Sequence, residues 1–203
     1  NTQVYLITAV ILILFFAAFV TLITSTGLKY IKQTRAEIRS EANRDPLTGA
    51  LNRRIGNEHL RRKFSQFKQG KRSPLIFMLD IDNFKQINDV YGHDSGDIVL
   101  RRLVKVIRGT MRETDYLFRW GGEEFIIAYI NCSFEDSLIA TEKLKNLIET
   151  DYILKDLTKS SVTASFGLTS LKKVDTLNDL INRADLAMYE SKNSGKNRIT
   201  IKN

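Results

Sequence analysis

The stretch Arg119-Trp120-Gly121-Gly122-Glu123-Glu124-Phe125 decides the fold of this chain. It lies between residues 116 to 120 and 125 to 130, two runs rich in the aromatic and β-branched side chains that strands favour. Glycine supplies the positive φ that a tight hairpin turn needs and, lacking a Cβ, lets a ligand approach the backbone. The stretch therefore predicts a β-hairpin with two carboxylates at its tip, although a solvated turn with two surface glutamates would show the same pattern.

A second acidic element lies upstream, where Asp80 and Asp82 end the apolar run 75 to 81. Such a run, bounded by turn residues, indicates a buried central strand, and its period of two places both aspartates on one face. If the hairpin pairs beside this strand, Glu123 comes close to Asp80. Neighbouring carboxylates repel unless a cation neutralises them, and oxygen ligands suit Mg²⁺. The alternative for Asp82, which we favour, is an N-cap of the helix that begins near Asn83.

Hydrophobic periodicity predicts the remaining elements. Helices are expected over residues 52–69, 84–90, 98–111, 134–148 and 177–192, and further strands over residues 161–169 and 198–201. This order predicts an α+β fold, with helices on one face of a mainly antiparallel sheet of the ferredoxin-like or palm type.

The N-terminal part of the chain differs in composition from the rest. Residues 1 to 28 carry no charge, and basic residues follow from Lys29 onward. About 20 apolar residues can span a bilayer, and the positive-inside rule puts the basic side in the cytoplasm. We therefore expect a transmembrane helix over residues 1–28, a location in the inner membrane, and a cytoplasmic domain. The chain begins with Asn rather than Met, so an upstream extracytoplasmic portion is also expected.

Residues 29–44 are expected to form a helical linker before a domain that covers residues 45–203. Apolar positions recur at coiled-coil spacing, as in Leu28, Ile31 and Ile38, but an amphipathic connector would show the same short pattern. The formal net charge of +8 is concentrated in residues 53 to 72, where a solvated helix face is favoured over contact with an anionic membrane. No nucleic-acid motif accompanies it, so no nucleic-acid partner is expected. The single cysteine, Cys132, excludes an internal disulfide.

Four motifs occur in order from residue 45 to the C-terminus. They are Asp45-Pro46-Leu47-Thr48-Gly49-Ala50-Leu51-Asn52-Arg53-Arg54, Asp80-Ile81-Asp82-Asn83-Phe84-Lys85-Gln86-Ile87-Asn88-Asp89-Val90-Tyr91-Gly92-His93-Asp94-Ser95-Gly96-Asp97, Gly121-Gly122-Glu123-Glu124-Phe125 and Lys192-Asn193-Ser194-Gly195-Lys196-Asn197. Together they resemble the motifs of GGDEF-domain diguanylate cyclases. The resemblance implies a palm-like fold that condenses two GTP into cyclic di-GMP and releases pyrophosphate.

The resemblance also implies roles for individual residues. Asp80, the carbonyl of Ile81 and Glu123 would hold Mg²⁺, with Mn²⁺ as an alternative. Asn88 and Asp97 would read the guanine base, with His93 nearby. The triphosphate would face Lys85, Lys192 and Lys196. Either Glu123 or Glu124 would help to remove the proton of the attacking 3′-hydroxyl.

Each of these assignments has a structural alternative. Asn88 could be a helix-surface residue, His93 part of a self-satisfied turn, Asp97 an N-cap, and the lysines ordinary surface residues. The family often has arginine at position 196, and a lysine keeps the charge but loses the bidentate geometry.

Arg112 and Asp115 precede the glycine turn and are similar to the inhibitory product site of many diguanylate cyclases. They would bind cyclic di-GMP, although a solvated helix end with an Arg–Asp pair is the alternative. Because each domain would hold one GTP, two copies must meet, and a homodimer is expected. The rival functions are a non-catalytic GGDEF module that signals through contacts, and a related cyclase with a monomeric cyclic product.

Overall fold

The computed structural model describes residues 16–17, 19–31, 42–68, 75–172 and 174–202. The chain divides into two compact units, Asn1–Ala42 and Asn43–Asn203. In the first unit, residues 19–31 are helical. Hydroxyl groups there donate to carbonyls one turn earlier, as from Thr21 to Ala17 over 2.7 Å. The middle of the expected linker, residues 32–41, and residues 1–15 of the expected membrane span lie outside the described residues.

The expected transmembrane helix needs correction. In the described ranges, no helix combines the length and the apolar character that crossing a bilayer demands. This finding contradicts the predicted localisation in an inner membrane, which we withdraw together with the membrane as a partner.

The second unit is built on one six-stranded sheet with the order β1-β3-β4-β2-β5-β6. Its strands are β1 (Leu51–Asn52), β2 (Leu75–Ile81), β3 (Tyr116–Arg119), β4 (Glu124–Tyr129), β5 (Ala164–Ser170) and β6 (Ile199–Ile201). The central strand β2 pairs antiparallel with β4 and β5, whereas β1 and β6 pair parallel with β3 and β5. The sheet is therefore mixed rather than purely antiparallel.

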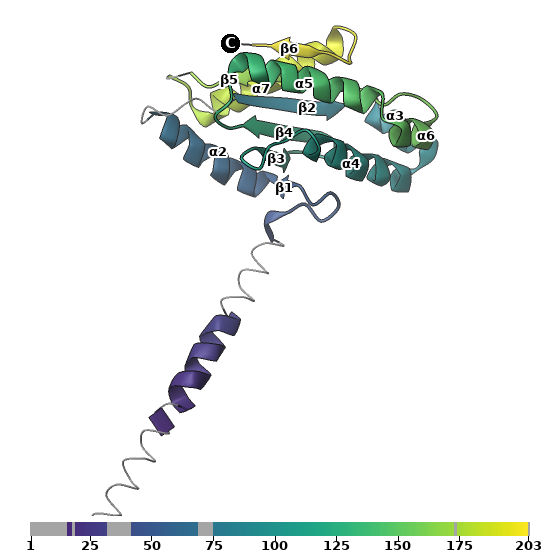
Figure 1. The fold of residues 1–203 in the computed structure, drawn as a ribbon. Coiled ribbons are helices and arrows are strands. Elements are labelled where there is room, and N and C mark those ends of the chain that lie inside the picture. Colours follow the sequence, from purple (N-terminus) through teal and green to yellow (C-terminus); the bar gives the residue numbers. More distant parts are fainter. Residues whose placement is uncertain (1–15, 18, 32–41, 69–74, 173, 203) are drawn as a thin grey trace, which may run out of the picture. The chain divides into compact units, whose positions relative to one another are not determined.

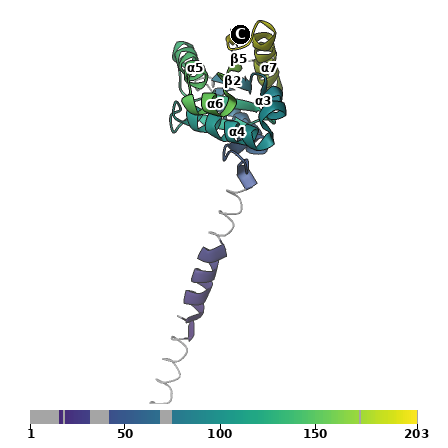
Figure 2. The same cartoon turned by 90° about the vertical axis from the view of Figure 1, so that its right-hand side faces the viewer.

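Helices cover both faces of this sheet, which corrects the expectation of one covered face (Figures 1 and 2). They are α2 (Arg53–Lys68), α3 (Phe84–Tyr91), α4 (His93–Arg108), α5 (Phe134–Glu149), α6 (Tyr152–Thr158) and α7 (Leu177–Asn193). Phe77 and Leu79 of β2 pack in one core cluster with residues of α4 and α5. Ile76 and Met78 point the other way and pack with residues of α2 and α7. A strand that is apolar on both faces needs a helical layer on each side.

Local signals explain where most helices begin. The side chain of Asn52 accepts a hydrogen bond from the Ile55 amide over 3.2 Å, as expected of the N-cap of α2. Helix α4 begins at His93, earlier than predicted, because Gly92 (φ 83°) ends α3 and directly precedes α4. Gly96 and Asp97 therefore lie inside α4, and Asp97 is not an N-cap. The short helix α6 was not predicted; Asp151 caps it.

Candidate active site

Asp80 lies near the end of β2, in the middle of the sheet. Its register partners are Glu124 on β4 and Ser165 on β5. The residue is only 3% exposed. Its Oδ2 lies 2.6 Å from Nζ of Lys192 on α7, whereas its Oδ1 is buried and accepts no hydrogen bond. A buried carboxylate oxygen without a donor is costly, so this atom is suited to receive a cation.

The electrostatics of Asp80 agree with this reading. Burial raises the pKa of Asp80 to about 6; the hydrogen bond and charge of Lys192 oppose that rise, and the charges of Glu123 and Glu124 add to it. The two glutamates are thus close enough to repel a negative Asp80. A cation bound between them would reverse that repulsion.

The predicted hairpin is present, and it places its carboxylates beside Asp80. The Trp120 amide donates to the Glu124 carbonyl over 2.8 Å and closes the turn. Glu124 lies opposite Asp80 in the register, and Glu123, which was expected near Asp80, belongs to the tip and is close enough for its charge to raise the pKa of Asp80. The Glu124 side chain folds over Gly121, where a Cβ would overlap its carboxylate. The glycine is therefore needed for the close approach of this side chain.

Arg119 fixes the hairpin tip to the first loop of the domain. Its Nε and Nη2 donate to the Gly122 carbonyl over 3.1 and 2.6 Å, and its Nη1 lies 2.8 Å from Asp45 Oδ1. Asp45 also accepts from the amide and the hydroxyl of Thr48 over 2.8 and 2.6 Å. Burial alone would raise the pKa of Asp45, but its bonds to Thr48 and Arg119 lower it below the usual value. Sequence reasoning missed this link, because Arg119 and Asp45 lie 74 residues apart in the chain.

Asn88, His93 and Asp97 lie on the adjoining helices α3 and α4. The Asn88 carboxamide packs directly on Gly96, where a Cβ would overlap its Oδ1 and lie 3.0 Å from its Cγ. Asp97 is partly exposed, and its Oδ2 is 3.8 Å from Nη2 of Arg101. His93 is exposed at the start of α4. The two helices therefore bring an amide and a carboxylate to one corner, in the combination that the guanine edge can use.

The three predicted phosphate lysines occupy different positions. Lys192 pairs with Asp80, and Lys196 donates to Oδ1 of Asn83. Lys85 is exposed on α3. The structure thus gathers two of the three cations around the end of β2 and leaves the third exposed on α3.

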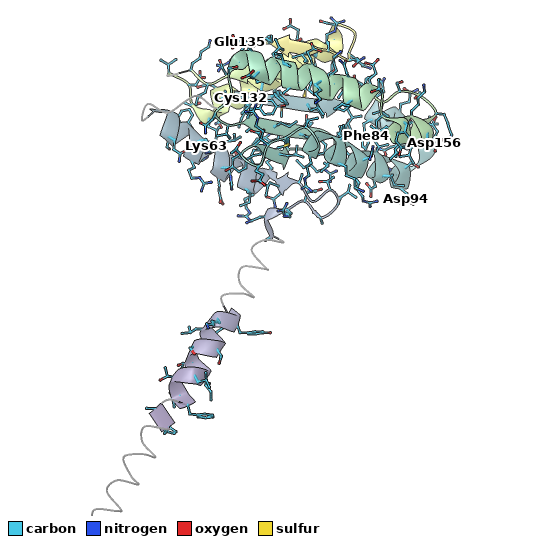
Figure 3. The ribbon with its side chains drawn as sticks, viewed as in Figure 1. Lys63, Phe84, Asp94, Cys132, Glu135 and Asp156 are labelled. Carbon is cyan, nitrogen blue, oxygen red and sulfur yellow. The ribbon has the colours of Figure 1, made fainter. Side chains whose placement is uncertain are left out.

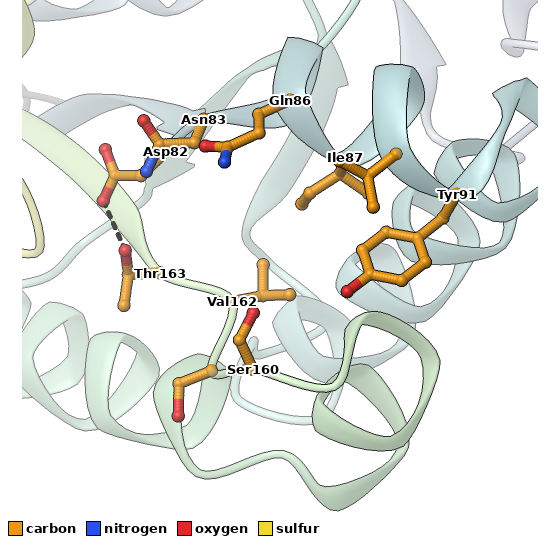
Figure 4. A pocket seen from close by; sticks show the side chains of 10 residues that line it. Asp82, Asn83, Gln86, Ile87, Tyr91, Ser160, Val162 and Thr163 are labelled. Atoms are coloured by element: carbon orange, nitrogen blue, oxygen red, sulfur yellow. Dashed lines mark hydrogen bonds between the residues drawn. The ribbon is translucent and has the colours of Figure 1, made fainter.

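Asp82 does not cap α3, which corrects the reading that the sequence favoured. Asn83 is the N-cap residue, with φ 58° and no side-chain cap bond. The Asp82 carboxylate is buried and accepts from the hydroxyl groups of Thr163 and Ser165 over 2.7 and 2.6 Å, and from the Asn197 amide over 3.0 Å. Figure 4 shows its bond to Thr163 beside a cavity of about 280 Å³ between α3 and residues 160–163.

Arg112 and Asp115 lie in the loop between α4 and β3. Asp115 accepts from the amides of Arg112 and Ile130 over 3.0 and 3.2 Å, so it holds the loop's own backbone. Both residues line a cavity of about 280 Å³ that also contains Cys132, which Figure 3 marks. Burial raises the pKa of the Cys132 thiol.

The donor set fits a hard divalent cation only in part before the substrate binds. Among the side chains that the structure describes, no three carboxylates, imidazoles or thiols already converge as metal ligands. Asp80 nevertheless offers a buried oxygen without a donor, and two further carboxylates act on it electrostatically. Oxygen donors of this kind, completed by a backbone carbonyl and substrate phosphates, suit Mg²⁺.

Comparison with known proteins defines the class to which this fold and site belong. The family model described as "Diguanylate cyclase, GGDEF domain" matches residues 42–198. The chain therefore belongs to the GGDEF-domain family, as its motifs predicted.

Curated relatives are similar to this chain over the same domain. Diguanylate cyclase A of Treponema denticola is 42% identical over 127 residues, which are 62% of this chain and 34% of the relative. Diguanylate cyclase VdcA of Vibrio cholerae is 36% identical over 173 residues, 83% of this chain and 50% of the relative. The chain thus spans at most about half the length of these relatives.

Solved structures show the same fold. The coiled coil and GGDEF domain of DgcB from Caulobacter crescentus, in complex with c-di-GMP, matches with a TM-score of 0.81 and 26% identity, covering 88% of this chain and 95% of that chain. Diguanylate cyclase SiaD from Pseudomonas aeruginosa, in complex with its activator SiaC, matches with a TM-score of 0.77 and 33% identity, covering 90% and 70%.

Proposed function

We propose that this domain is a diguanylate cyclase that condenses two GTP into cyclic di-GMP and two pyrophosphates. The observation that carries the proposal is the buried, donor-free Oδ1 of Asp80 beside a Gly-Gly-Glu-Glu hairpin and the Lys192 ammonium. Carboxylates and cations in one place serve phosphoryl transfer, in which positioning and charge neutralisation supply most of the catalysis. Family membership and the diguanylate cyclases among the relatives support the same activity.

The metal in this proposal is Mg²⁺, with Mn²⁺ as an alternative. Asp80, the carbonyl of Ile81 and Glu123 would hold it, and when bound it would polarise the phosphate oxygens and neutralise charge. The raised pKa of Asp80 supports this assignment, because a cation is what favours the ionised form of such a buried carboxyl.

The chain's own residues would orient the two GTP molecules and neutralise the charge of their phosphates. Lys85, Lys192 and Lys196 would face the triphosphate, while Asn88 and Asp97 would hold the guanine with His93 at the rim. The 3′-oxygen of one GTP attacks the α-phosphorus of the other, the bond to the β-phosphate oxygen breaks, and pyrophosphate leaves. Either Glu123 or Glu124 would take the proton of the attacking hydroxyl.

Two further features complete the proposal. Each domain would bind one GTP, so two copies must face each other as a homodimer, and a helical linker would hold them together. The DgcB structure, which contains a coiled coil and a GGDEF domain, supports that role by similarity. Arg112 and Asp115 would bind cyclic di-GMP and slow the reaction as product accumulates. The cavity that both residues line supports this assignment.

The decisive experiment is incubation of the purified chain with GTP and Mg²⁺, followed by mass identification of the product. Cyclic di-GMP is expected, and Glu123→Gln should lower the rate more than about tenfold, or 1.4 kcal/mol of barrier. The matched control is Glu135→Gln, which changes an exposed carboxylate on α5 and should leave the rate unchanged. Cyclic GMP would instead identify a mononucleotide cyclase, and GTP binding without product would identify a non-catalytic module.

A further inference from the structure

The turn between α7 and β6 has an unusual backbone that requires support. Gly195, Lys196 and Asn197 follow one another with φ values of 109°, 62° and 46°. For residues other than glycine the left-handed region costs about 1 kcal/mol or more, so surrounding contacts must hold it. The Lys196 amide donates to the Ser191 carbonyl over 3.0 Å, which anchors the turn to the helix. The contact on the other side of the turn comes from Asp82.

Asp82 joins three segments of the domain. It is 4% exposed, and its carboxylate accepts one hydrogen bond from the Asn197 amide and two from hydroxyl groups that flank the start of β5. Its own amide donates to the Thr163 carbonyl over 2.9 Å. The end of β2, the start of β5 and the turn after α7 thus meet at one buried carboxylate. Charge-assisted bonds of this type are among the stronger ones in proteins.

Asn83, the residue after Asp82, also bonds to this turn. Asn83 Oδ1 accepts from the Lys196 ammonium. Asp82 therefore binds the backbone of the turn at Asn197, and Asn83 binds the charged side chain of Lys196. The two aspartates of the strand end are therefore used differently. Asp80 keeps an oxygen free of donors, whereas both oxygens of Asp82 are occupied by neutral donors.

We propose that Asp82 is a positioning residue that places Lys196 for the nucleoside triphosphate, and that it is not a metal ligand. The inference rests on the proposed function, because Lys196 acts only if the site binds a triphosphate. Asp82 acts through the backbone of residue 197 and touches neither substrate nor metal. Its loss would leave the Lys196 ammonium present but wrongly directed.

A double-mutant cycle on nucleotide affinity tests this proposal. The probe is an α,β-methylene analogue of GTP with Mg²⁺, which cannot release pyrophosphate. Asp82→Asn keeps the shape, but a neutral carboxamide with one acceptor oxygen removes the charge that strengthens the bond from the Asn197 amide. We expect Asp82→Asn and Lys196→Ala each to weaken binding about tenfold, and the double variant also about tenfold, because the two changes remove one interaction.

Thr163→Val is the matched control, since it removes one bond to the same carboxylate but leaves the bond to Asn197. It should change the affinity less than about twofold, near the limit of additivity errors. Equal weakening by Thr163→Val, a hundredfold loss in the double variant, or normal binding by Asp82→Asn would each overturn the proposal.

A measurement on the unmodified chain covers the case in which Asp82→Asn does not fold. The Asn197 amide should exchange with deuterium at least about a hundredfold slower than in an open turn, because a buried acceptor protects it. Fast exchange would overturn the proposal. If the chain binds the analogue but yields no cyclic di-GMP from GTP, the proposed function fails, while the double-mutant cycle still tests the role of Asp82. If the chain does not bind the analogue, the proposed function and the role of Asp82 are both overturned.

Discussion

Gly96→Ala should damage guanine recognition without damaging the fold. A Cβ at this position would overlap Asn88 Oδ1 and lie 3.2 Å from Phe84 Cζ, so the Asn88 carboxamide has to leave its place. The carboxamide is the end of a flexible side chain and can rotate outward. Alanine is also the better helix former by about 1 kcal/mol, which offsets the small shift required of the buried Phe84 ring, so the melting temperature should change little.

The loss in affinity follows from the bonds that Asn88 would make to the base. One or two neutral hydrogen bonds at about 1 kcal/mol each correspond to a five- to thirtyfold weaker binding of GTP. Asn88→Ala should cause a loss of the same size. Once the carboxamide is absent, the added methyl group of Gly96→Ala has nothing to displace, so the double variant should match Asn88→Ala within about twofold.

The assay is titration of each variant with the α,β-methylene analogue of GTP, together with a thermal melt. Losses that multiply in the double variant would show that Gly96 acts independently of Asn88. If Gly96→Ala binds the analogue with normal affinity, the proposed contact between Asn88 and the guanine base is wrong.

Three further outcomes are expected. Burial raises the pKa of Asp80 to about 6. Between about pH 4 and 6, Asp80 is therefore protonated in the native state but ionised in the unfolded chain. The free energy of unfolding without metal should therefore fall by at most about 3 kcal/mol as pH rises through that window, and a flat profile in urea melts would contradict this. Arg119→Lys loses the forked contact with Gly122 and Asp45, so turnover should slow about tenfold with little change in melting temperature. An unchanged rate would show that the hairpin tip does not need the contacts of Arg119. Arg112→Ala should keep the initial rate but abolish slowing by added cyclic di-GMP, and a wild-type time course that stays linear would disprove the inhibitory site.

The sequence predicted those parts of the fold that depend on local pattern. The hairpin at Gly121, the buried strand that ends at Ile81, and the helix that begins beside Asn52 were all predicted from turn chemistry and periodicity. Strand β1 (Leu51–Asn52) and helix α6 (Tyr152–Thr158) were missed, because elements so short carry little periodic signal. The second helical layer was missed for another reason: an apolar strand does not reveal which helices will cover each face.

The candidate site was predicted by motif and corrected by tertiary contacts. The structure places two of the predicted residues together, since Lys192 Nζ lies 2.6 Å from Asp80 Oδ2. The sequence could not show that Asp82 bonds to Asn197, or that Arg119 reaches Asp45 across 74 residues. Such partners depend on how the strands align in space, and no spacing along the chain encodes that alignment.

The link between Arg119 and Asp45 has a consequence for how the domain can evolve. One guanidinium holds both the hairpin tip and the loop in which the domain begins. A substitution at either end leaves a charged group without its partner in a partly buried place, which is more harmful than changing both. Positions 45 and 119 should therefore covary among homologous chains, and domains that have lost one of the two residues should have lost the other as well.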